Sequence, residues 1–189
     1  MQIYEPSDDS YLMQESVKEY LEDSLKKRKM TKEIEILDMG SGSGIQAETV
    51  KSLGFNNVLT VDINKSAVDF LKKQGFEAIH SDLFKKIKNN QKFDLIIFNP
   101  PYLPLDKREP KESQLQTTAG KDGYEIILKF LTQAKSHINN SSSVLLLFSS
   151  LSQPKIILAH AEKSGYKYKK INSKKLFFEE LYVYLFRLK

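Results

Sequence analysis

The segment IEILDMGSGSGIQAETVKSLGFNNVLTVDI, residues 34–63, decides the fold. It opens with a short apolar run at 34–39, passes through three closely spaced glycines, and continues into a helical pattern that ends at Gly54. A second apolar run, 57–63, follows directly. A strand, a glycine-rich turn, a helix and a second strand are typical of a parallel βαβ unit, because a crossover helix carries the chain back to the start of the next parallel strand.

The same alternation continues on both sides of this unit. Apolar runs predict further strands at 77–80, 93–98 and 143–148, and periodic patterns predict helices at 8–29, 65–75, 122–138 and 154–163. The last two predicted strands, 166–172 and 180–188, have no helical pattern between them, so we expect a hairpin whose final strand runs antiparallel to its neighbours. Buried strands that alternate with helices predict an α/β fold, with a mainly parallel sheet covered by helices on both faces.

Length and composition point to one folded domain. A chain of 189 residues with 40% hydrophobic residues suits a single α/β domain, which we divide into an N-terminal segment and helix (1–30) and a core (31–189). No apolar run approaches the ~18 residues that span a bilayer, so we expect no membrane association. The first residues lack a secretory pattern, and we therefore expect a cytoplasmic location.

Metal binding and nucleic-acid binding are both disfavoured by composition. The chain has no cysteine, and its three histidines, at 80, 137 and 160, are far apart, so we predict no metal site. The net charge of +5 leaves nucleic acid open as a partner. The excess is nearly all lysine, however, whereas base and phosphate recognition favours the planar fork of arginine.

The glycine-rich turn and two acids predict a nucleotide-like ligand. Gly40, Gly42 and Gly44 follow the first strand with the spacing GxGxG, one residue shorter than the dinucleotide fingerprint GxGxxG. Asp62 ends the second strand, where a carboxylate can accept both ribose hydroxyls, and Asp82 follows the third, where it can accept from an adenine amino group. Taken singly, Asp62 could instead cap the next helix and Asp82 could close a turn.

The motif Asn99-Pro100-Pro101-Tyr102, directly after the fourth strand, predicts the reacting group. The side-chain oxygen of Asn99 and the carbonyl of Pro100 can act as two acceptors on a loop that the prolines stiffen. Two fixed acceptors match the two hydrogens of a planar NH2 group, and Tyr102 offers a flat surface for it. The alternative is a proline-stiffened loop with no chemical role.

An amide or aromatic amine nitrogen is a poor nucleophile because its lone pair is delocalised. Accepting both N–H bonds positions such a nitrogen and favours its attack on an activated methyl group. No strong general base is needed, and no histidine lies near the motif.

These motifs resemble class I S-adenosylmethionine-dependent methyltransferases. The Asn-Pro-Pro-Tyr motif is similar to that of amino-methyltransferases, which act on glutamine amides or on exocyclic amines of adenine and guanine. Residues 4–12, YEPSDDSYL, resemble the YEPxEDT(F/Y)L segment of HemK-like protein-(glutamine-N5) methyltransferases of archaea and eukaryotes, which modify the GGQ glutamine of class I release factors. Residues 118–125, TAGKDGYE, resemble that family's GGxxG(R/W)E. The chain departs from the first pattern at Asp9-Ser10 and from the second at Ala119 and Tyr124.

The resemblance implies a Rossmann-like, seven-stranded sheet with an antiparallel last strand, and S-adenosylmethionine as the cofactor, released as S-adenosylhomocysteine. It also implies that residues 4–10 fold over the methionine end of the cofactor, although Asp8, Asp9 or Ser10 could instead cap the first helix. The catalytic residues would be Asn99, Pro100 and Tyr102. The cofactor-binding residues would be Tyr4, Pro6, Asp9, Ser10, Asp38, Gly40, Ser41, Gly42, Gly44, Asp62, Ile63, Asp82, Leu83 and Asn99.

The resemblance further implies a release factor as the protein substrate and a small zinc-binding activator as a heterodimer partner. Apolar residues around the second strand, Phe55, Val58 and Leu59, suggest a surface for that partner. We also predict that the loop 103–120 closes as a lid over the substrate. Two alternatives stay open, an N-methyltransferase that acts on adenine or guanine in RNA or DNA, and a non-catalytic scaffold that binds adenosylmethionine.

Overall fold

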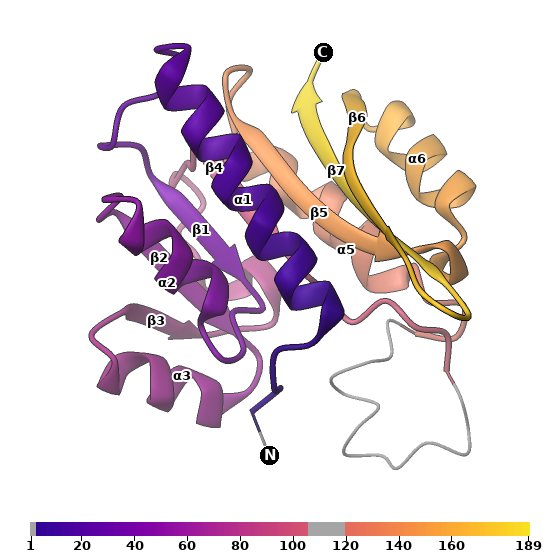
Figure 1. Cartoon of the computed structure of the whole chain (residues 1–189), viewed down its shortest axis with the longest axis horizontal. Helices are drawn as coiled ribbons and strands as arrows, with labels where there is room; N and C mark the ends of the chain where they lie inside the picture. Colours follow the sequence, from indigo (N-terminus) through magenta and orange to yellow (C-terminus); the bar gives the residue numbers. More distant parts are fainter. Residues whose placement is uncertain (1–2, 106–119) are drawn as a thin grey trace.

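A computed structural model describes residues 3–105 and 120–189, and this part of the chain forms one seven-stranded sheet in the order β3-β2-β1-β4-β5-β7-β6 (Figure 1). The first five strands of that order are parallel to one another, and β7 is antiparallel to both β5 and β6. The predicted mainly parallel sheet with a closing hairpin is therefore confirmed. The strands are β1 (Ile36–Met39), β2 (Val58–Asp62), β3 (Glu77–His80), β4 (Leu95–Phe98), β5 (Ser143–Ser149), β6 (Tyr166–Lys175) and β7 (Glu180–Leu188).

Helices cover both faces of the sheet. On one face lie α1 (Asp8–Lys26), α2 (Ile45–Ser52) and α3 (Lys65–Lys73), and on the other lie α5 (Glu125–Ala134) and α6 (Pro154–Lys163). Figure 1 shows α1 crossing the front of the sheet, with α5 behind it. Short 3-10 turns complete the fold at η1 (Leu83–Lys86), η2 (Lys135–His137) and η3 (Ser150–Ser152). None of the helices described here has the length and apolarity needed to cross a membrane.

The continuous apolar strands of the sequence follow from this double cover. In β4 the side chains of Leu95 and Ile97 pack with the α1 layer, whereas Ile96 and Phe98 pack with the α5 layer. Successive strand side chains point to opposite faces, so a strand buried on both faces is apolar at every position. All four residues of β4 are buried.

Several predicted ends shift by a few residues. Helix α1 stops at Lys26 rather than at residue 29, and Arg28 adopts a left-handed backbone conformation with φ +52°. Ser7 is the N-cap residue, so the expected caps Asp8, Asp9 and Ser10 lie inside the first turn instead. Negative charge is still favourable there, because the helix N-terminus carries a partial positive charge.

Four further outcomes concern the C-terminal half, the proposed partner surface and the predicted lid. The predicted helix 122–138 consists of α5 followed by η2, and β6 extends to Lys175 rather than to residue 172. Phe55, Val58 and Leu59 are buried in the core, so the expectation that they form a partner surface is wrong. Most of the predicted lid, residues 106–119, lies outside the described residues.

Candidate active site

The glycine-rich turn after β1 needs glycine at three positions, of which Gly44 begins α2 with φ +87°. Gly40 and Gly42 have φ values of +64° and +52°, which lie in the left-handed region that residues other than glycine rarely adopt. A Cβ atom on Gly40 would also lie 3.1 Å from the ring of Phe98. The turn ties neighbouring strands together, since the Gly42 N–H donates to Asp62 Oδ2 at 2.8 Å. The turn therefore presents open backbone at the carboxyl edge of the sheet, as the sequence predicted.

A cavity of about 760 Å³ opens at this edge. Its wall includes thirteen of the residues expected to bind cofactor or take part in catalysis: Tyr4, Asp9, Ser10, Asp38, Gly40, Gly42, Asp62, Ile63, Asp82, Leu83, Asn99, Pro100 and Tyr102. Parallel strands bring their carboxyl ends to one edge, and residues that are up to about a hundred positions apart therefore meet there.

Three expected cofactor residues are not on this wall. Ser41 is buried and its hydroxyl donates to the Asp38 carbonyl at 2.7 Å, which closes the turn from inside. Gly44 is the N-cap residue of α2, and a Cβ there would lie 2.7 Å from a methyl group of Leu71. Pro6 is also absent from the wall. Ser41 and Gly44 thus shape the turn rather than line the cavity.

The sequence analysis missed other wall residues, of which Gln46 is the most informative. Its Nε2 donates to the Ser10 carbonyl at 2.9 Å, and its Oε1 is buried without a donor among the described residues. A polar residue in the first turn of α2 was the available signal. The remaining missed residues are mostly apolar or small and carry no chemical signal: Met39, Ile45, Val61, Asn64, Ala67, Ser81, Phe98 and Ile126. Pro101 of the motif and the two ends of the predicted lid, Leu103 and Gly120, also lie on the wall.

Asp9 determines how Asn99 presents its amide. Asn99 Nδ2 donates to Asp9 Oδ2 at 2.9 Å, and the hydroxyl groups of Tyr4 and Ser10 reach Asp9 Oδ1 at 3.1 and 3.4 Å. Because an ionised carboxylate only accepts hydrogen bonds, the nitrogen of Asn99 faces Asp9 and the oxygen faces away. Asn99 Oδ1 is buried and meets no donor in the described part of the chain. A buried acceptor of this kind is suited to a donor from a bound molecule.

The loop after Asn99 is held from two sides. The carbonyl of Tyr102 accepts from Ser152 Oγ at 2.7 Å. On the other side Gly123 presses against the loop, because a Cβ there would lie 2.8 Å from the Tyr102 carbonyl and 2.9 Å from Pro104 N. Burial raises the pKa of the Tyr102 phenol well above its ordinary value, so this ring stays neutral. The position of the Asn-Pro-Pro-Tyr loop is thus supported by tertiary contacts as well as by its prolines.

Asp38 is buried beneath the turn. Burial raises its pKa from 3.8 to about 7, an effect that the hydrogen bond from Ser41 opposes and the nearby carboxylate of Asp62 reinforces. Asp38 Oδ2 has no partner among the described residues. A cation placed beside this oxygen would favour the ionised form.

Asp62 is also buried on the cavity wall, and burial raises its pKa, while backbone N–H groups oppose that shift. Its two oxygens accept from Gly42 N at 2.8 Å and Asn64 N at 2.7 Å. The side chain that caps α3 is Asn64, which accepts from Ser66 N. The alternative role of Asp62 as a helix cap is therefore excluded.

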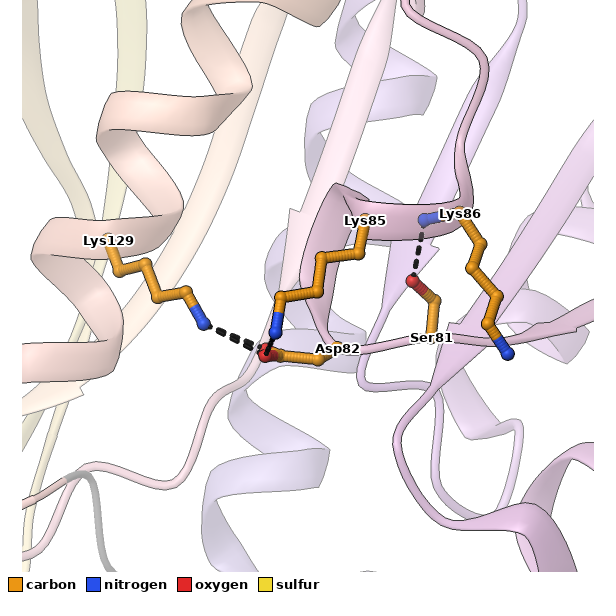
Figure 2. Close-up of polar contacts among 5 residues, drawn as sticks. All are labelled: Ser81, Asp82, Lys85, Lys86 and Lys129. Atoms are coloured by element: carbon orange, nitrogen blue, oxygen red, sulfur yellow. Dashed lines mark hydrogen bonds and ion pairs between the residues drawn. The ribbon is translucent and has the colours of Figure 1, made fainter.

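Asp82 lies in a different environment. Figure 2 shows its carboxylate between two lysine ammonium groups, Lys85 at 2.7 Å and Lys129 at 3.0 Å. These hydrogen bonds lower the pKa of Asp82 below its ordinary value, and the side chain is 27% exposed. Local sequence patterns do not predict Lys129 beside Asp82, because this lysine comes from α5. Asp82 is thus an ionised acceptor already engaged by two cations.

Comparison with known proteins identifies the family. Residues 18–164 match the methyltransferase small domain family. The chain belongs to this family. The methyltransferase is 32% identical to a protein of Methanocaldococcus jannaschii with the provisional name protein N5-glutamine methyltransferase, over 96% of this chain and 90% of that relative. It is 31% identical to a release factor glutamine methyltransferase of Rhodopirellula baltica over 70% of this chain, and the match covers only 50% of that bacterial relative.

Solved structures agree with this assignment. The methyltransferase superposes on a chain of the E. cuniculi Mtq2–Trm112 complex, described as responsible for methylation of the eRF1 translation termination factor, with a TM-score of 0.75, 25% identity and full coverage of both chains. A ribosomal protein L11 methylase of Lactobacillus delbrueckii, at 19% identity and a TM-score of 0.66, shares the fold. The protein is an S-adenosylmethionine-dependent N-methyltransferase with a class I fold.

Proposed function

We propose that this enzyme transfers a methyl group from S-adenosylmethionine to the side-chain amide nitrogen of a protein glutamine, the GGQ glutamine of a class I release factor. The observation that carries the proposal is the oxygen of Asn99 on the cavity wall. It faces away from Asp9 and is a buried acceptor that meets no donor among residues 3–105 and 120–189. The names of the relatives favour a glutamine amide over other planar NH2 groups.

The cavity residues fit the cofactor. A volume of about 760 Å³ lies within the range of small-molecule sites, about 300–1,000 Å³. The unpaired oxygen of Asp38 suits the ammonium group of the methionine end, and Asp62 suits the ribose hydroxyls. Asp82 and the Leu83 backbone would face the adenine ring, with the side chain of Ile63 against it. Bound S-adenosylmethionine supplies an activated sulfonium methyl group.

The protein contributes orientation and electrostatic stabilisation. Asn99 Oδ1 would accept one N–H of the glutamine amide, and the Pro100 carbonyl the other, so that the nitrogen lone pair is directed at the methyl carbon. With S-adenosylmethionine bound, its sulfonium would supply the methyl group to the oriented nitrogen, and the proton that the amide nitrogen gives up would pass to water. Asp9 would act indirectly. Its carboxylate accepts from Asn99 Nδ2 and so keeps the Asn99 oxygen turned toward the substrate amide.

We also propose that a small zinc-binding protein activates the enzyme as a heterodimer partner. The superposition on a chain from the Mtq2–Trm112 complex supports the existence of a partner protein. That this partner binds zinc stays a prediction. Strands β3 and β6 form the two edges of the described sheet. Strand β6 carries five lysines, which oppose strand addition, whereas β3 carries none, so β3 is the better edge for a partner.

Co-expression with such a partner should raise solubility and methyl transfer, whereas full activity of a monodisperse lone chain would reject an obligatory partner. The cytoplasmic location also stays a prediction.

The deciding experiment compares methyl acceptors. Tritiated methyl transfer from S-adenosylmethionine should label an intact release factor and should not label a variant in which the GGQ glutamine is replaced by alanine. Bulk RNA and DNA serve as the competing acceptors, because an Asn-Pro-Pro-Tyr loop can grip any planar NH2 group. Labelling of nucleic acid with none on the release factor would replace the proposal with the adenine or guanine reaction.

A further inference from the structure

The turn between β6 and β7 exposes two adjacent phenylalanines. Leu176 N donates to the Glu179 carbonyl at 2.8 Å and closes the turn. Between them, Phe177 and Phe178 are 90% and 84% exposed, more than any other large hydrophobic residue among those described. Their rings meet edge to face, with centroids 4.6 Å apart. The two rings contact each other and leave most of their surface to water.

The tip of this hairpin is joined to the candidate active site on both of its strands. On the β6 side, Lys174 Nζ lies 2.9 Å from the carboxylate of Asp8, the residue before Asp9. On the β7 side, Glu180 N donates to Ser150 Oγ at 3.0 Å, within the same short turn whose Ser152 holds the Tyr102 carbonyl. Figure 1 shows the turn between β6 and β7 at the same end of the sheet as the start of α1.

Folding of the chain does not account for these two side chains. The hairpin is stabilised by buried residues of β7 such as Leu181 and Val183, which pack under α1, and the phenylalanines add nothing to that core. Hairpin turns ordinarily use Gly, Asn, Asp or Ser, which remain polar in water. Adjacent exposed aromatic residues on a protein surface mark a contact with another molecule.

We propose that Phe177 and Phe178 form a docking element for the protein substrate, inserting into an apolar depression of the release factor beside its methylated loop. The inference rests on the proposed function. The position favours this occupant over others, because a molecule that contacts the hairpin tip is next to the loop that grips the acceptor amide. Lys175, the last residue of β6 before the turn, is exposed as well, so the tip would favour a partner surface that carries negative charge.

A docking contact outside the cavity would add binding energy that the glutamine loop of the substrate does not provide by itself. A glutamine that follows two glycines has neighbours with no side chains, so the cavity can gain few contacts from them. Aromatic anchors that fill a pocket on the partner are common sources of binding energy at protein interfaces. The element would therefore distinguish an intact folded substrate from a short peptide of the same sequence.

The test is the double substitution Phe177→Ser and Phe178→Ser, assayed with intact release factor and with a short peptide that contains the GGQ loop. We expect the KM for the intact factor to rise at least tenfold, while kcat, the peptide KM and the cofactor Kd stay within twofold of wild type. Replacing both residues with leucine should restore the KM to within threefold. Ile156→Ser, on the surface of α6 and 38% exposed, is the matched control and should change nothing.

Three results would overturn the docking element. The serine variant could keep the wild-type KM for intact factor, or lose activity equally on factor and peptide, which would indicate a distorted site. Alternatively, wild type and not the serine variant could bind phosphatidylglycerol vesicles or single-stranded RNA, with no change in KM for the factor. If the wild-type enzyme does not label the release factor, the proposed function is rejected as well. This outcome needs no comparison with the variants, so it is distinct from a failure of the docking element alone.

Discussion

Asp38 and Asp82 both lie on the wall of one cavity, yet their surroundings differ in every respect. Asp38 is buried beside Asp62, one of its oxygens has no partner in the part of the chain that the structure describes, and its pKa is raised to about 7. Asp82 is partly exposed between Lys85 and Lys129, and its pKa is lowered. Asn99 lies on the same wall as both and is oriented by Asp9. Water and neighbouring cations determine how much each acid contributes.

This difference predicts a gradient of effects along the cavity. Replacing a buried group that lacks an alternative partner should cause a large loss of activity or a large change in stability, because it leaves a second buried group unsatisfied. Groups that are exposed and already paired should be cheap to change, since water and salt compensate for them. Four substitutions test the gradient, beginning with Asn99 and ending with Lys129, which pairs with Asp82.

Asn99→Ala should have the largest effect. Removing the acceptor aimed at the reacting nitrogen should lower kcat at least a hundredfold, on the order of 3 kcal/mol of transition-state stabilisation. Cofactor affinity, measured by calorimetry, should survive in large part. Wild-type turnover in Asn99→Ala would show that the acceptor amide is gripped elsewhere.

Asp9→Asn should have the next largest effect. The change keeps the size of the side chain but removes the charge-assisted hydrogen bond to Asn99 Nδ2, so the Asn99 amide can turn over. We expect kcat to fall tenfold or more, on the order of 1.5–2 kcal/mol.

Asp8→Asn is the matched control for this change, because Asp8 is the neighbouring residue, pairs with Lys174, and is not on the cavity wall. Equal kinetics of the two variants would remove Asp9 from the role of orienting Asn99.

Asp38→Asn should change the pH dependence of folding. A carboxyl group whose pKa is raised on folding stabilises the protein most at low pH, and this advantage is lost as pH rises through about 7. The variant cannot ionise, so it should gain stability relative to wild type by at least about 1 kcal/mol between pH 5 and pH 8, without cofactor.

Urea unfolding at a series of pH values measures this difference. Asp23→Asn is the control, because the hydrogen bond from Lys27 lowers the pKa of Asp23, and no gain with pH is expected there. A flat difference between wild type and Asp38→Asn would mean that Asp38 is solvated in the free enzyme.

Lys129→Met should have the smallest effect. The ion pair with Asp82 is partly exposed, and Lys85 remains on the same carboxylate, so the cofactor Kd should change less than threefold, below about 0.7 kcal/mol. The small change should shrink further in high salt. A tenfold or larger change measured by calorimetry would break the proposed gradient and make Lys129 part of cofactor recognition.

Much of the fold could be predicted from residue patterns. Strands β3 and β7 and helix α6 have the predicted bounds, because their apolar periodicity is strong and their ends are marked by glycine, proline or a charged turn. The lengths of β6 and α1 were less predictable. The polar residues of β6 form a strand because β7 offers a ladder of partners, with a shift of register between Lys170 and Asn172. Helix α1 ends just before Arg28, which adopts a left-handed backbone conformation.

The candidate site divides in the same way. Glycine, aspartate and Asn-Pro-Pro-Tyr motifs placed at strand ends led to most of the cavity wall. The missed apolar residues, such as Phe98 and Val61, look like ordinary core positions in a sequence. Lys129 on Asp82 was missed for a different reason, since it lies 47 residues away and its contact with Asp82 depends on how α5 packs.

The sequence by itself determined the alternation of strands and helices, the positive φ values at Gly40 and Gly42, and the stiff loop at residues 99–102. These features depend on a residue and its near neighbours, through sterics and hydrophobic periodicity. Only the tertiary structure decided that Asp9, 90 residues from Asn99, orients its amide, and that Asp38 is buried while Asp82 is paired. Hydrogen bonds and pKa values depend on distance and solvent access in three dimensions, which local sequence does not specify.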